Sequence, residues 1–106
     1  MELECKYRTK EDGTLYTANQ YPKVVEELYQ TRKLILKIPN SHEREALLDF
    51  ISIVEYAVFD EGGAYFKNWL KLNRCVLKEM LNIFFAERLN GALMWAVKGR
   101  LEKIIA

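Results

Sequence analysis

The stretch from residue 64 to residue 89 constrains the fold most, because its apolar residues follow a helical repeat for about seven turns. These residues cover roughly half the circumference of a helix that advances about 100° per residue. They are Tyr65, Phe66, Trp69, Leu70, Leu72, Val76, Leu77, Met80, Leu81, Ile83 and Phe84. So broad a face requires more than one neighbour. The sequence therefore predicts a long helix over 64–89 in the main core.

A second helix is predicted before it, from about residue 41 to Phe59. Asn40 or Ser41 is its expected N-cap, and Asn40 with Glu43 resembles a capping box. The Gly62-Gly63 pair ends this helix, since glycine commonly follows a helix C-terminus. Its apolar stripe consists of Leu47, Phe50, Ile51, Val54, Ala57 and Val58.

A last helix is predicted over 92–105, after Asn90-Gly91. Its inward positions are expected to be Leu93, Ala96, Val97, Leu101, Ile104 and Ile105.

The first forty residues carry β patterning as well as helical patterning. Residues 3–9 alternate apolar and polar side chains, Asp12-Gly13 is a strong hairpin signal, and residues 14–18 fit a returning strand. Pro22 suits the first turn of a helix. This helix is expected to span 22–31 and to precede a third strand at 33–38, although its apolar spacing also continues in helical register to Ile38.

These elements predict an α+β, mainly helical fold. A small N-terminal β-hairpin or three-stranded sheet would pack beside three C-terminal α-helices. The element order would be β-β-α-β-α-α-α, or β-β-α-α-α-α if 33–38 is helical. We expect one domain over 1–106, in which 1–39 holds the hairpin, the short helix and the possible third strand, and 40–106 forms the helical core.

Composition and cysteine content indicate a globular cytoplasmic protein. Half of the 106 residues are hydrophobic and 29% are charged, which is typical of a folded domain. Cys5 and Cys75 are expected to be reduced thiols, because no targeting segment is evident at the N-terminus. The longest apolar stretch, 50–59, is too short to cross a bilayer and contains Glu55.

The charges are sorted along the chain. Residues 1–61 carry twelve acids against eight Lys/Arg, a balance of −4, whereas residues 62–106 carry eight Lys/Arg against three acids, a balance of +5. Lys67, Lys71, Arg74 and Lys78 share one side of the predicted long helix. We expect this basic row to face the acidic helix 43–61 or to form a solvated side of the long helix. The alternative is that it binds phosphate groups or an acidic partner.

No residues suggest catalysis, a cofactor or a metal. The chain has one histidine, His42, so a nucleophile–base pair has few possible members. His42, Glu45 and Asp49 share a helical face, but no second helix offers matching ligands. Gly62-Gly63 lacks the remaining residues of a phosphate-binding loop. The sequence therefore favours a protein that is not an enzyme.

The surplus of apolar positions on helices 46–59 and 64–89 predicts a protein-contact function. We expect a small regulatory or binding protein that forms a homodimer, with contact to a larger protein partner also open. The expected interface residues are Tyr56, Trp69, Met80, Met94 and Trp95. The runner-up is a DNA- or RNA-binding protein that uses the basic row.

Overall fold

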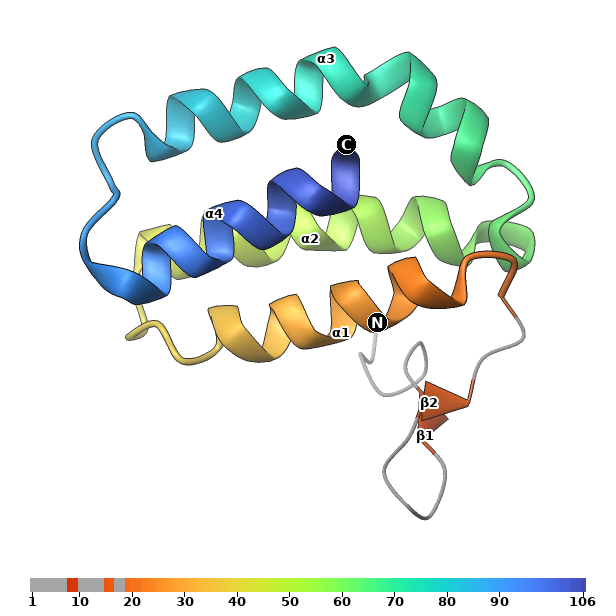
Figure 1. Ribbon diagram of the computed structural model, residues 1–106, viewed down its shortest axis with the longest axis horizontal. Helices are drawn as coiled ribbons and strands as arrows, with labels where there is room; N and C mark the ends of the chain where they lie inside the picture. Colours follow the sequence, from red (N-terminus) through yellow and green to blue (C-terminus); the bar gives the residue numbers. More distant parts are fainter. Residues whose placement is uncertain (1–7, 10–14, 17–18) are drawn as a thin grey trace.

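Four α-helices make up the body of the protein (Figure 1). The computed structural model describes residues 8–9, 15–16 and 19–106. The helices are α1 (Pro22–Ile35), α2 (His42–Phe59), α3 (Phe66–Phe85) and α4 (Gly91–Ile105), and a 3-10 turn over Asp60–Gly63 joins α2 to α3. The three helices predicted after residue 40 are confirmed, although the longest ends at Phe85 rather than near residue 89.

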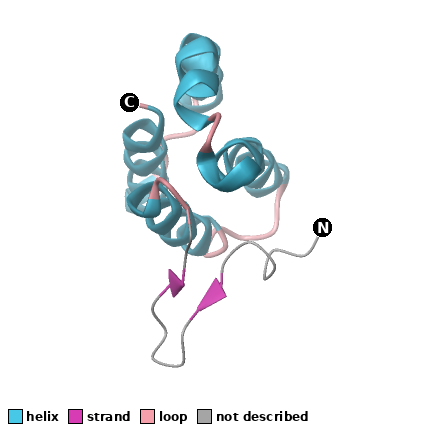
Figure 2. Cartoon of the chain, turned by 90° about the vertical axis from the view of Figure 1, so that its right-hand side faces the viewer, coloured by secondary structure: helices cyan, strands magenta, loops and turns pink. Residues whose placement is uncertain are grey.

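Helix α1 packs against both α2 and α4, and α3 packs mainly against α4. Helix α3 meets α2 over a shorter length. The end-on view shows α3 at the edge of the assembly, with the other helices grouped below it (Figure 2). Helix α3 therefore has one side in the core and a large uncovered surface.

Each helix contributes one apolar stripe to the core, as amphipathic helices do. The buried hydrophobic residues are Val25, Leu28, Ile35, Ile38, Leu47, Phe50, Ile51, Val54, Val58, Phe66, Leu70, Leu77, Leu81, Phe85, Val97, Leu101, Ile104 and Ile105. The core thus draws on α1 and α4 as well as on the long helix.

The predicted strand at 33–38 is wrong. Residues 33–35 are the last residues of α1, and turns follow at 36–38. Thr31, Ile35 and Ile38 are buried and continue the helical spacing of Val25 and Leu28. The helical spacing of the apolar residues therefore decides the structure here, rather than the short apolar–polar alternation around Leu34. Only the helical spacing places all of these apolar side chains against α2 and α4.

The predicted α+β class is also wrong, because the fold is built from helices. Much of the predicted hairpin, including Asp12-Gly13, lies outside the described residues. The described remainder is two segments of two residues, β1 (Arg8–Thr9) and β2 (Leu15–Tyr16), which pair antiparallel. Segments this short form no layer of the fold. Among the described residues, no sheet covers the helices.

The junction between α2 and α3 is fixed by contacts with the start of α1. The Asn19 side-chain amide donates to the carbonyl of Val58 at 2.6 Å, and its Oδ1 accepts from the backbone N–H of Tyr21 at 2.8 Å. The backbone N–H of Gln20 donates to the carbonyl of Gly62 at 2.8 Å. These bonds hold the reversal between α2 and α3 against the first turn of α1.

The start of α2 confirms one of the two expected caps. Ser41 is the N-cap, and its Oγ accepts from the backbone N–H of Arg44 at 3.3 Å. Glu43 and Glu45 lie in the first turn, where acids interact favourably with the helix dipole.

Candidate functional site

Most of the large exposed hydrophobic side chains lie on α2, on α3 or at the residue just before α3. Nine such side chains are exposed among the described residues, and seven of them belong to this region. We call these seven the outer apolar surface. They are Ile53, Tyr56, Tyr65, Leu72, Val76, Met80 and Ile83.

The most exposed members lie on α3. Leu72 is 74% exposed, Val76 is 60% exposed and Ile83 is 66% exposed. These residues recur every four or seven positions, so their side chains point to one side of the helix. That side is distinct from the core-facing side, which carries Leu70 and Leu77. Helix α3 therefore carries apolar side chains on two sides, one exposed and one facing the core.

A groove between α2 and α3 adjoins this surface. Its volume is about 240 Å³, and its lining is apolar except for Asp49. The lining residues are Ala46, Leu47, Asp49, Phe50, Ile53, Met80, Leu81 and Phe84. Ile53 and Met80 belong to both features, so the groove is continuous with the outer apolar surface.

The structure separates the five predicted interface residues. Tyr56 and Met80 lie in the outer apolar surface. Trp69 is half-buried and stacks on Phe66, with ring centroids 6.2 Å apart. The two residues on α4 belong elsewhere: Met94 packs on the core, and Trp95 is exposed beneath the ammonium of Lys98.

Sequence reasoning missed Ile53, Tyr65, Leu72, Val76 and Ile83 as surface residues. Their signal was present, because the apolar positions of 64–89 cover too wide an arc for a single packing side. The sequence does not say which part of that arc the neighbouring helices cover.

The basic row does not pair with α2. Lys67, Lys71 and Lys78 are exposed, and none of them forms an ion pair with an acid of the described residues. Arg74 is half-buried, and its Nε donates to the carbonyl of Ile105 at 2.9 Å. Arg74 and Lys78 therefore border α4, and the expectation that the row faces the acidic helix does not match the structure. The reason is that α3 turns Met80 and Phe84 toward α2.

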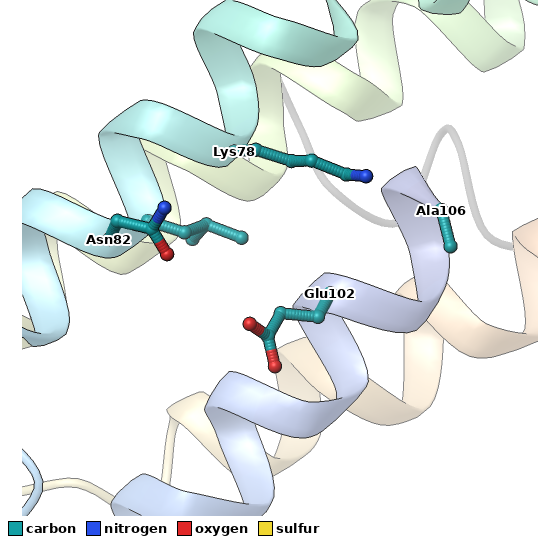
Figure 3. A pocket seen from close by; sticks show the side chains of 5 residues that line it. Lys78, Asn82, Glu102 and Ala106 are labelled. Atoms are coloured by element: carbon teal, nitrogen blue, oxygen red, sulfur yellow. The ribbon is translucent and has the colours of Figure 1, made fainter.

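A second hollow lies where the row meets α4 (Figure 3). Its volume is about 340 Å³, and it is lined by Lys78, Leu81, Asn82, Glu102 and Ala106. Lys78 and Asn82 reach it from α3, and Glu102 reaches it from α4 (Figure 3). The Glu102 carboxylate accepts from the Lys98 ammonium at 3.0 Å. This arrangement offers polar contacts from both helices.

In the described part of the chain, no group of three or more His, Cys, Asp or Glu side chains is placed to hold a metal ion. None of the four helices combines the length and the apolar character that crossing a membrane requires.

No protein-family model, no curated protein and no solved structure matches this chain.

Proposed function

We propose that the protein is a small non-enzymatic binding protein that acts through protein–protein contacts as a homodimer. The outer apolar surface carries this proposal. Monomeric proteins rarely expose large contiguous apolar patches, and such patches commonly mark binding sites. Among the described residues, six of the nine exposed large hydrophobic side chains belong to α2 and α3, and a seventh, Tyr65, directly precedes α3.

The exposed apolar residues fit the centre of an interface. Together the seven side chains expose the equivalent of about four whole residues. A standard interface involves roughly 20–30 residues on each partner. The outer apolar surface therefore supplies an apolar centre, and polar residues around it would complete the contact.

The composition of the surface and its surroundings also fits self-association. Tyr56 and Met80 are residue types enriched in interfaces, and the exposed acids Asp49 and Glu79 supply a polar rim. The lysines of the basic row lie on roughly the opposite side of α3 from Val76. Two copies could therefore meet through their apolar stripes without bringing these lysines together.

Two observations support a non-enzymatic role and a cytoplasmic location. His42 is exposed at the start of α2, and neither Ser41 nor Ser52 is hydrogen-bonded to it in the described structure, which favours a role without nucleophilic catalysis. Cys75 is an exposed free thiol, which fits the reducing cytoplasm as the place of action.

Size-exclusion chromatography with light scattering tests the homodimer. Wild type should elute with twice the chain mass at high micromolar concentration. Val76→Glu and Ile83→Glu should each give a monomer that keeps its helical circular dichroism, because each places a charge in the apolar contact. Leu36→Glu is the matched control, since Leu36 is 45% exposed outside this surface, and it should stay dimeric. A monomeric wild type would refute the homodimer.

Nucleic-acid binding is a second candidate function. Its supporting observation is separate, namely the three exposed lysines of the basic row that have no acidic partner in the described structure.

A further inference from the structure

The basic side chains of α3 and α4 differ in how the fold neutralises them. On α4, Arg100 and Lys103 both pair with Glu27 of α1, at 3.4 Å and 3.7 Å. Lys98 pairs with Glu102 at 3.0 Å. All three bases of α4 thus have an acid of this chain beside them.

Helix α3 lacks such partners along its basic row. Lys67, Lys71 and Lys78 are exposed and lie on one side of the helix, without an ion pair to any acid that the structure describes. Eleven residues separate the first of these lysines from the last, or about 16 Å along the axis. Within α3 and α4, the basic side chains that have no acidic partner among the described residues are therefore concentrated on this one strip.

We propose that this row, formed by Lys67, Lys71 and Lys78, binds the phosphate backbone of nucleic acid without reading its sequence. This inference deepens the second candidate function and does not depend on the homodimer. A strand of duplex DNA places a phosphate about every 3.4 Å along the axis. A row about 16 Å long therefore spans several phosphates, and the flexible lysine stems can reach different ones.

The polar groups beside the row fit the same partner. The exposed amides of Asn68 and Asn82 flank the lysines and can donate to phosphate oxygens, as asparagine commonly does at nucleic-acid backbones. The nearest acid of α4 is Glu102, at the hollow beside Lys78 (Figure 3). Its charge is already compensated by Lys98, so it opposes a phosphate only weakly.

The chemistry of the row favours a polyanion over a protein partner. Protein interfaces have an apolar centre surrounded by polar groups, whereas the exposed large hydrophobic residues of α3 lie on its other side. Lysines without an apolar centre suit contacts governed by counterion release.

Fluorescence anisotropy with labelled probes tests the proposal. The probes are a mixed-sequence DNA duplex, a mixed-sequence single-stranded RNA and polyglutamate of matched charge. Wild type should bind both nucleic acids, and three contacts should weaken duplex binding about 40-fold between about 50 mM and 200 mM salt. Polyglutamate should bind more weakly than either nucleic acid.

Two triple variants remove the same charge from different places. Changing Lys67, Lys71 and Lys78 to Gln should abolish most of the binding and lower the salt slope by about 2.7. Changing Arg88, Arg100 and Lys103 to Gln removes three charges outside the row and keeps the Lys98–Glu102 pair, so it should leave the binding within a few-fold of wild type. Circular dichroism checks that both variants are folded.

Three results would overturn the proposal. The first is a wild-type protein that binds neither nucleic acid at low salt. The second is an equal loss of binding in both variants, which would show that net charge alone is responsible. The third is tighter binding to polyglutamate, which would indicate an acidic protein partner. Each is measured independently of the mass of the protein, so the homodimer is tested separately.

Discussion

Arg32 on α1 holds the buried carboxylate of Glu55 on α2 through two hydrogen bonds. Its Nε donates to Oε2 at 2.9 Å, and its Nη2 donates to Oε1 at 2.6 Å. The Glu55 side chain is 1% exposed and that of Arg32 is 11% exposed. Arg32 also donates to the Oγ of Ser52 at 3.1 Å. The pair thus lies inside the contact between α1 and α2.

Removing one member of this pair should cost more than removing both. Arg32→Met leaves the Glu55 carboxylate buried without its partner, which should lower the free energy of unfolding by about 3–5 kcal/mol. The double variant Arg32→Met, Glu55→Met should recover most of that loss, because apolar side chains of similar volume can replace a buried pair. Urea denaturation measures both. A double variant less stable than Arg32→Met would contradict this expectation.

Gly63 should not tolerate a side chain. Its φ is +97°, and a Cβ there would lie 3.0 Å from Oδ1 of Asn19 and 3.0 Å from the ring of Tyr21. We expect Gly63→Ala to destabilise the protein by more than about 1 kcal/mol.

Gly99→Ala is the matched control for that variant. Gly99 lies within α4 with open space around its added Cβ, and alanine there should stabilise the helix by about 0.5–1 kcal/mol. Thermal denaturation should therefore move in opposite directions for the two variants, and a shared direction would show that the reversal before α3 is not constrained as described.

The two tryptophans should contribute differently to stability. Trp69 stacks on Phe66 and packs against the core, so Trp69→Ala should cost about 2 kcal/mol, below the 3–5 kcal/mol typical of a fully buried tryptophan. Trp95 is 57% exposed, and Trp95→Ala should change stability by less than about 0.5 kcal/mol. Urea denaturation of both variants at low protein concentration tests this difference. Equal losses would mean that Trp69 does not anchor α3.

Cys75 should react readily in the folded protein. It is a free, exposed thiol, so a thiol reagent added under native conditions should modify it without denaturant. Cys75→Ser should remove that reaction. In unreduced, denatured wild type we expect two reactive thiols, the second from Cys5, which lies outside the described residues. A titration that finds none would indicate a disulfide.

The sequence predicted the helices from residue 41 onward because long periodic stripes and end signals agree there. Ser41, Leu47 and Ile51 illustrate this agreement, since the cap and the buried stripe fall where expected. The prediction from sequence was wrong at 33–38, where the six residues fit both a helical repeat and the alternation of a strand. Tertiary contacts decided that segment, because Ile35 in the last turn of α1 and Ile38 in the turn that follows both lie in the core.

The candidate surfaces were harder to predict than the helices. Lys67, Lys71 and Lys78 were recognised as one row, but their surroundings depend on which helix lies beside them. The short Gly62-Gly63 connection suggested that they would face α2. In the structure Arg74 and Lys78 border α4 instead, and the bases of α4 pair with Glu27 and Glu102. Pairing between residues as distant as Glu27 and Arg100 carries no local signal.

The contact of α1 with α4 has a consequence for how the protein opens. The two helices lie far apart in the sequence, yet both contribute buried residues to one core and pack against each other. Detaching α4 would therefore expose part of the apolar side of α1 to water. The backbone amides of the two helices should then show similar protection in hydrogen exchange, because local opening of one helix weakens the other.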